Sequence, residues 1–185
     1  MKEDIRMFTR PFYYLRHGET ESNAARLIAG SLDVDLTALG REQARIAARA
    51  LAGEPITAIY SSPLRRARHT AEPVAEALKL PITVIAEIAE RNWGVLEGKP
   101  RDTRIRGTMP TGAEGGRDFV QRVLRGFSSI DADVPLIVAH SGIFRVLCRT
   151  LAIVETAGPV TNALPLRFVP SRDGAWCVEA LNAAS

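Results

Sequence analysis

Long apolar runs are missing from this chain, and so is a hydrophobic leader. No stretch approaches the roughly 20 consecutive apolar residues that a membrane-spanning helix needs. The chain begins with Met1-Lys2-Glu3-Asp4, whose two acids are atypical of a secretory signal, and no apolar segment of leader length follows. These absences predict a cytoplasmic protein that has no membrane partner.

Cysteine and lysine are also scarce. The two cysteines, Cys148 and Cys177, lie in apolar segments without metal-site spacing, so we expect buried free thiols; a disulfide between them is the less favoured alternative. Only three of the 24 basic residues are lysine, and the other 21 are arginine. Two explanations of this excess stay open: a compositional bias of the genome, or a set of ligands for phosphate and carboxylate groups. Because no lysine-rich tract or basic–aromatic interleaving occurs, we expect no nucleic-acid partner.

Neither a linker nor a repeat interrupts the chain, so we predict a single domain over residues 1–185. Apolar segments of strand length alternate with segments whose apolar residues recur every three or four positions. This alternation is typical of an α/β three-layer sandwich, in which helices flank a largely parallel central sheet. The predicted strands are 11–15, 56–60, 82–86, 135–139, 164–169 and 176–181, and the predicted helices are 39–51, 64–78, 119–127 and 143–151.

Three local features refine this prediction. Thr37 has the residue type and position of an N-cap for the first helix. Pro73 lies inside the second helix and should kink or split it. Glycines, prolines and charges dominate residues 92–116, which we expect to be mostly loop with a short helical turn.

Histidine occurs only three times, and two of the three have matching surroundings. His17 and His140 each directly follow a predicted strand and precede a small residue. Ligands of such sheets bind at the carboxyl ends of the strands, so both imidazoles are expected in one site. A lone histidine is more often structural, but this pair, with Arg16 before the first member, favours catalysis. His69 lies on a predicted helix and is expected to be solvated or packed.

Four ordered motifs carry a resemblance to a known family. They are Arg16-His17-Gly18-Glu19-Thr20 with Asn23, Ser61-Ser62-Pro63-Leu64-Arg65-Arg66-Ala67, Glu90-Arg91-Asn92-Trp93-Gly94, and Val138-Ala139-His140-Ser141-Gly142. Together they resemble the histidine phosphatase superfamily, in its phosphoglycerate-mutase-like branch. The similarity extends from residue 14 to about residue 145.

The resemblance implies phosphoryl transfer through a phosphohistidine. It makes His17 the nucleophile and Glu90 the general acid and base, while Arg16, Arg66 and His140 form a phosphate cradle and Asn23 is a secondary phosphate contact. It implies no metal ion and no cofactor. The residue types suit the chemistry, because positive charge must stabilise the equatorial oxygens and the nucleophile must be held in line. A bound phosphate dianion should favour a protonated His140 and a protonated Glu90, while His17 must be neutral to attack.

The chain departs from the mutases of this family at a short lid around residues 99–110. Where the resemblance implies a long insertion, only the eleven residues Lys99–Met109 occur. Arg101, Arg104 and Arg106 in the lid are candidate contacts to a second anionic group, the alternative being solvated loop charges. Gly115 stands where the family often has a serine, which removes one phosphate or helix-cap contact.

A short lid excludes less water, so the phosphohistidine is expected to pass its phosphoryl group to water. We therefore predict a phosphomonoesterase whose partner is a small phosphorylated metabolite. The alternatives are a phosphoglycerate-type mutase and, from another class, a non-catalytic phospho-ligand- or RNA-binding module. The substrate classes left open are sugar phosphates, carboxylated phosphoesters, nucleotide-derived esters and phosphoproteins. No pattern in the sequence indicates an oligomeric state.

Overall fold

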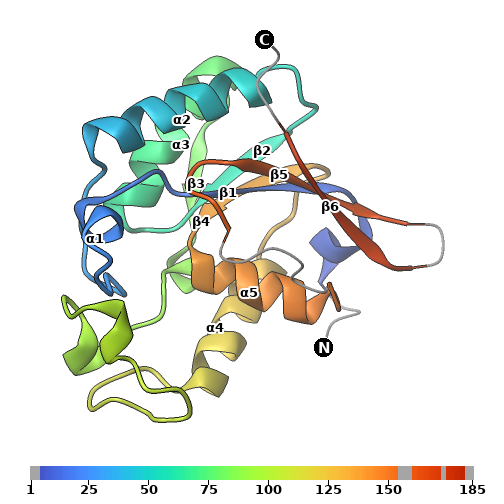
Figure 1. Cartoon of the computed structure of the whole chain (residues 1–185). Helices are drawn as coiled ribbons and strands as arrows, with labels where there is room; N and C mark the ends of the chain where they lie inside the picture. The colour runs from blue at the N-terminus through green and yellow to red at the C-terminus, as the bar shows by residue number, and fades with distance from the viewer. Residues whose placement is uncertain (1–4, 154–159, 172–173, 182–185) are drawn as a thin grey trace.

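A mixed six-stranded sheet forms the centre of the protein (Figure 1). The computed structural model describes residues 5–153, 160–171 and 174–181. Residues 1–4, whose two acids are atypical of a secretory signal, lie outside the described residues. The strand order is β3-β2-β4-β1-β5-β6. The four strands β1, β2, β3 and β4 run parallel to one another. Strand β5 is antiparallel to β1, and β6 is antiparallel to β5. The strands are β1 Phe12–Arg16, β2 Ala58–Ser61, β3 Ile82–Val84, β4 Pro135–Ala139, β5 Pro165–Pro170 and β6 Trp176–Ala180.

Helices cover both faces of the sheet, which confirms the predicted α/β three-layer sandwich. In Figure 1, α2 and α3 lie on one side and α4 and α5 on the other. The α-helices are α1 Glu21–Ala24, α2 Ala38–Leu51, α3 Arg65–Leu78, α4 Gly116–Ser128 and α5 Ser141–Thr150. Short 3-10 helices occur at Arg6–Thr9, Ala86–Ile88, Gly94–Leu96 and Arg101–Thr103. The prediction that residues 92–116 are mostly loop is confirmed, but the segment contains two of these turns where one was expected.

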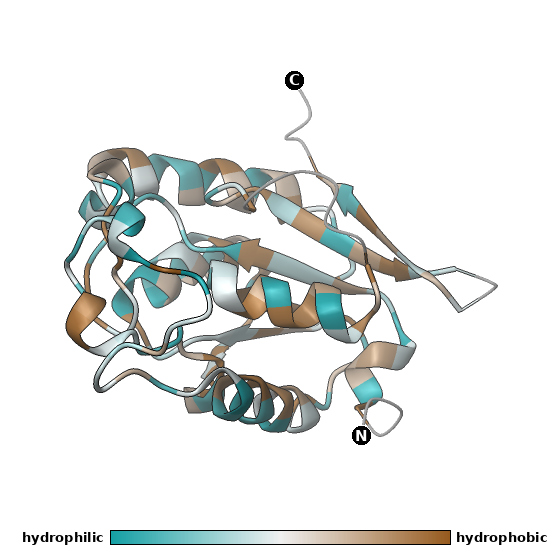
Figure 2. Cartoon of the chain, turned by 60° about the horizontal axis from the view of Figure 1, so that its bottom comes forward, coloured by the Kyte–Doolittle hydropathy of each residue, from teal (hydrophilic) through white to brown (hydrophobic). Residues whose placement is uncertain are grey.

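Alternation along the central strand β1 divides the core into two clusters. Phe12 and Tyr14 pack in the cluster that contains buried residues of α4 and α5, whereas Tyr13 and Leu15 pack in the cluster that contains α2 and α3. A strand with helices on both faces is buried on both faces and reads as a continuous apolar run. The banded colouring of the helices in Figure 2 shows their amphipathic character.

Two sequence-based expectations are wrong in part. Of the kink or split expected at Pro73, the split does not occur, because α3 continues from Arg65 to Leu78. A proline inside a helix costs about 3 kcal/mol. However, buried side chains of α3 before and after Pro73 hold the helix against the sheet. Cys177 is exposed, whereas Cys148 is buried as expected. The thiol of Cys177 lies on the edge strand β6, where the neighbouring Trp176 and Val178 pack against the core instead.

The turn after β1 depends on two glycines in contact. A Cβ at Gly18 would overlap the carbonyl of Gly40, and a Cβ at Gly40 would overlap the backbone of Glu19. Gly40 lies in the first turn of α2, where the hydroxyl of Thr37 accepts its N–H at 2.9 Å, as the predicted N-cap requires. This contact brings the start of α2 against the residues that follow β1.

Gly40→Ala is expected to lower the free energy of unfolding by about 1–3 kcal/mol, because the new methyl group meets backbone atoms that cannot move independently. Urea-induced unfolding measures the change. Gly53→Ala is the matched control, since a Cβ there has no neighbour within 4 Å. Equal stability of the two variants would contradict the close-contact explanation.

Candidate active site

The parallel pairing of β1 with β4 brings the two motif histidines together. Arg16 and Ala139 are register partners, so His17 and His140 leave the sheet side by side. The backbone N–H of His17 donates to the carbonyl of Ala139 at 3.0 Å, and the two imidazole centroids lie 5.2 Å apart. The expected position at the carboxyl ends of the strands is thus confirmed for both histidines.

His17 is held in one tautomer. Its Nδ1 lies 2.7 Å from the carbonyl oxygen of Gly18, which can only accept, so Nδ1 carries the proton and Nε2 keeps its lone pair. The side chain is buried, and burial, followed by the charges of Arg66 and Arg16, lowers the pKa of His17 well below 6.5. A neutral imidazole with a free Nε2 is the form that can attack phosphorus.

His140 is fully buried beside His17. Its Nε2 lies 2.6 Å from the hydroxyl of Ser62, and its backbone carbonyl accepts the phenol of Tyr14 at 2.5 Å. Burial, then Arg66 and His17, lowers the pKa of His140 well below 6.5. The protein groups alone therefore favour neutral His140, so the protonated form expected from the sequence requires the opposing charge of a bound dianion.

Two guanidinium groups are buried at the same strand ends. Arg16 is 7% exposed and donates to the carbonyl of Val160 at 2.6 Å; burial lowers its pKa to about 10. Arg66 is 1% exposed and donates to the carbonyls of Leu32 and Gly30 at 2.6 and 2.7 Å. Within the described part of the chain, neither Nε atom has a hydrogen-bond partner. These buried donors and charges fit an anionic ligand.

Asn23 reaches the pocket from α1. It closes a capping box with Thr20, in which its Oδ1 accepts the backbone N–H of Thr20 at 3.2 Å. The same oxygen accepts from the amide of Asn162, whose nitrogen also donates to the carbonyl of His17 at 2.8 Å. These bonds leave the Asn23 amide nitrogen as its remaining donor, in keeping with the predicted phosphate contact. Asn162 was not found from the sequence, because it lies 145 residues from His17.

Glu90 is fixed by backbone donors. Its Oε2 accepts the N–H of Gly142 at 2.9 Å, in the first turn of α5, and its Oε1 accepts the N–H of Arg91 at 2.8 Å. A Cβ at Gly142 would overlap the Glu90 carboxylate, so only glycine permits this approach. The general acid and base expected from the sequence is therefore held on the same helix terminus that follows His140.

A partly buried ion pair supports the segment that carries Glu90. Arg122 of α4 binds the Glu114 carboxylate through two bonds of 2.8 Å and donates to the carbonyls of Glu87 and Ala89. Arg91 in turn donates to the carbonyl of Glu114. Gly115 is the N-cap of α4 and makes no side-chain cap bond, as expected from the missing serine.

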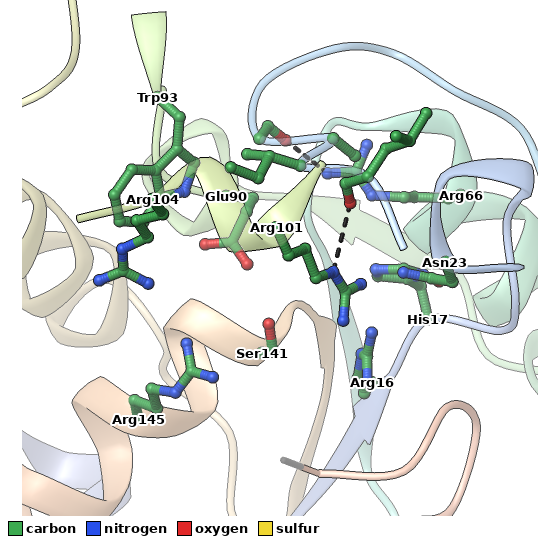
Figure 3. A pocket seen from close by; sticks show the side chains of 14 residues that line it. Arg16, His17, Asn23, Arg66, Glu90, Trp93, Arg101, Arg104, Ser141 and Arg145 are labelled. Carbon is green, nitrogen blue, oxygen red and sulfur yellow. Dashed lines mark hydrogen bonds between the residues drawn. The ribbon is translucent and has the colours of Figure 1, made fainter. Parts of the chain in front are cut away.

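These side chains surround a pocket of about 160 Å³ (Figure 3). It is lined by Arg16, His17, Asn23, Arg66 and Glu90 together with Trp93, Arg101, Arg104, Ser141 and Arg145. Every predicted site residue lines this pocket except Arg106 and His140. His140 is fully buried beside His17, with the two imidazole centroids 5.2 Å apart. Arg101 donates to the carbonyl of Leu27 at 3.3 Å, and in the view of Figure 3 it lies between Glu90 and His17.

Arg145 and Trp93 were missed in the sequence. Arg145 follows Ser141 by four residues on α5, a spacing that places both on one helix face, so this signal was present. Trp93 contacts two arginines, with the Arg91 guanidinium 4.3 Å and the Arg104 guanidinium 4.1 Å from ring centroids. No sequence spacing predicts such a stack.

Among the described residues, no three His, Cys, Asp or Glu side chains form a group that could hold a metal ion. In the same part of the chain, no helix has the length and apolarity needed to cross a membrane. His69, assigned no role above, bonds to Asp35 at 2.6 Å and does not line the pocket.

Acid is expected to destabilise the protein below pH 6.5 in phosphate-free buffer, because the unfolded chain takes up protons at His17 and His140 that the folded chain resists. Each histidine contributes a slope of about 1.4 kcal/mol per pH unit to the free energy of unfolding. Denaturant titrations between pH 6 and pH 5 should therefore show a slope about 1.4 kcal/mol per pH unit smaller in His17→Gln than in the wild type. Identical slopes would show that His17 is protonated in the folded chain.

Comparison with known proteins agrees with this geometry. Residues 12–165 match the family model of the histidine phosphatase superfamily (branch 1). A Yersinia pestis protein named "Probable phosphoglycerate mutase GpmB" is 34% identical over 157 residues, covering 75% of this chain and 73% of its own. The mycobacterial glucosyl-3-phosphoglycerate phosphatase superposes with a TM-score of 0.77 at 28% identity, covering 95% and 100% of the two chains. The alpha-ribazole phosphatase from Shigella flexneri gives 0.78 at 26% identity, covering 93% and 96%. The chain therefore belongs to the histidine phosphatase superfamily.

Proposed function

We propose that the protein is a phosphomonoesterase that works through a phosphohistidine at His17 and needs no metal ion. One observation carries the proposal: the free Nε2 of neutral His17 lies in a pocket with two buried guanidinium groups whose Nε atoms are unpaired within the described residues. Positive charge without a carboxylate partner suits a phosphate dianion, and a neutral nucleophile suits attack on it.

The first step transfers the phosphoryl group to the enzyme. The Nε2 lone pair of His17 forms a bond to phosphorus while the bond from phosphorus to the ester oxygen breaks. Arg16 and Arg66 stabilise the charge on the equatorial oxygens, and His140 adds a third donor when the dianion holds it protonated. Glu90 protonates the departing alkoxide, since its carboxyl group faces the pocket on fixed backbone donors.

The second step returns the enzyme to its starting state. Glu90, now ionised, accepts a proton from water as the water oxygen attacks phosphorus, and the bond from phosphorus to Nε2 breaks. His17 regains its neutral, Nδ1-protonated form, which the carbonyl of Gly18 favours. Glu90 is again protonated and ready for the next ester, so protons and electrons balance over the cycle.

The lid favours hydrolysis over mutase chemistry. All residues from Arg101 to Met109 are exposed, and the segment carries a single 3-10 turn, Arg101–Thr103. A mutase must protect its phosphohistidine from water and rebind the product, which needs a more enclosed site. Mutase activity stays the alternative, because one relative of this chain is named as a phosphoglycerate mutase. Product analysis separates the two: a mutase interconverts isomeric monoesters without releasing orthophosphate.

A non-catalytic phospho-ligand- or RNA-binding module is the rival from another class. Such a protein would need the arginines but not the fixed tautomer of His17 or the tethered carboxylate of Glu90. The presence of both supports the enzyme.

His17→Ala is expected to abolish release of orthophosphate from p-nitrophenyl phosphate in the presence of chelator, because it removes the nucleophile. Far-UV circular dichroism should be unchanged. Brief mixing of wild type with labelled substrate, followed by denaturation without acid, should trap a base-stable, acid-labile label on His17. Full activity in the variant, or a label on serine or aspartate, would falsify the mechanism.

Glu90→Gln is expected to lower the rate on alkyl phosphates by about 10²- to 10⁴-fold and the rate on aryl phosphates much less, because a phenolate leaves without needing a proton. Gly142→Ala is a second probe: its methyl group would displace the Glu90 carboxylate and should give the same dependence on leaving group. Steady-state kinetics on both ester types test the pair. Equal losses on the two esters would make Glu90 a positioning residue instead of a proton donor.

A further inference from the structure

Five arginines from two separate segments line an open basin beside the catalytic pocket. Arg101, Arg104 and Arg106 come from the lid, and Arg145 and Arg149 come from α5. This arginine basin has a volume of about 570 Å³, against about 160 Å³ for the catalytic pocket. Arg101, Arg104 and Arg145 line both spaces, so the basin lies next to the pocket that holds His17.

The charges of the basin have no carboxylate partner in the part of the chain that the structure describes. Within the described residues, none of the five guanidinium groups forms an ion pair with a carboxylate. Arginines elsewhere do so; Arg41 pairs with Asp35 and Arg65 with Asp33. Burial, then the like charges of Arg145, Arg91 and Arg106, lowers the pKa of Arg104. Like charges kept this close favour binding of an anion that relieves their repulsion.

The basin is also held in place by structure. Arg104 stacks on Trp93 at 4.1 Å, and Arg101 is tied to the carbonyl of Leu27. Arg145 and Arg149 lie four residues apart on α5, so they occupy one face of that helix. Figure 3 shows Arg145 extending from α5 toward the side of the pocket that holds Arg104 and Glu90. An anion in the basin would therefore meet donors from two fixed directions.

We propose that the arginine basin is a second anion subsite, which binds a further phosphoryl group of the substrate whose first phosphoryl group reacts at His17. The inference rests on the proposed function and deepens it: the preferred substrates are small bisphosphorylated or polyphosphorylated molecules. A single carboxylate would leave most of the five charges unmatched, whereas phosphoryl groups offer several oxygens to the planar fork of each guanidinium. A basin of about 570 Å³ fits a small polyanion better than a nucleic acid.

Binding of inorganic tripolyphosphate and orthophosphate tests the subsite directly. Calorimetry on the full chain carrying His17→Ala, without divalent metal, avoids turnover of either ligand. Tripolyphosphate, which can span both spaces, should bind at least about tenfold more tightly than orthophosphate. The double variant Arg106→Gln/Arg149→Gln changes two residues that line the basin and not the catalytic pocket. It should lower the preference for tripolyphosphate over orthophosphate by about tenfold.

The matched control removes the same charge elsewhere. Arg68→Gln with Arg125→Gln changes two exposed arginines, of α3 and α4, that line neither space, and should keep the preference. With His17 present, both double variants should hydrolyse p-nitrophenyl phosphate like the wild type, while only the basin variant should lose inhibition by tripolyphosphate.

Each outcome decides one of the two proposals. Turnover of the aryl phosphate without any preference for tripolyphosphate, or an equal loss of preference in both double variants, overturns the subsite. If the preference for tripolyphosphate depends on Arg106 and Arg149 but the wild type does not hydrolyse the aryl phosphate, the subsite is supported and the phosphomonoesterase is overturned. Single-stranded RNA that binds more tightly than tripolyphosphate, through the same two arginines, would overturn the small-polyanion assignment.

Discussion

Two buried guanidinium groups without a carboxylate partner in the described structure are the constraint on which the site depends. Burying a charge is costly unless polar groups surround it, and here backbone carbonyls do so for Arg16 and Arg66. Because carbonyls are neutral, the positive field remains, and it adds to burial, the larger cause, in lowering the pKa of both histidines. The same field makes the pocket complementary to a dianion. The same two guanidinium groups thus contribute both to the neutral state of the nucleophile and to the charge that the ligand must carry.

The sequence predicted the parts of the fold that obey local rules. The apolar run at β1, the cap at Thr37 and the helical periodicity of α3 each depend on neighbouring residues. The matching positions of His17 and His140 after strands were enough to place them together, because parallel strands end at one edge. Pro73 was misjudged because the packing that holds α3 comes from residues distant in sequence.

The outer wall of the site could not be predicted in this way. Trp93 and Asn162 contribute through contacts that depend on how loops approach one another. The lid arginines were grouped by their spacing in the sequence, and all three line the arginine basin, but only Arg101 and Arg104 also line the catalytic pocket. The helical spacing between Ser141 and Arg145 could have predicted that both residues line the pocket. That spacing becomes informative only once Ser141 is known to lie at the edge of the pocket.

The position of Trp93 gives the protein a built-in optical reporter. The chain has two tryptophans, and the other, Trp176, packs against Phe12 on the far side of β5. The emission of an indole depends on charges near its ring, and Trp93 carries two guanidinium groups within 4.3 Å of ring centroids. A ligand that draws Arg104 away from the ring changes that local field, whereas the surroundings of Trp176 stay constant. Intrinsic fluorescence can therefore follow occupancy of the pocket without any added label.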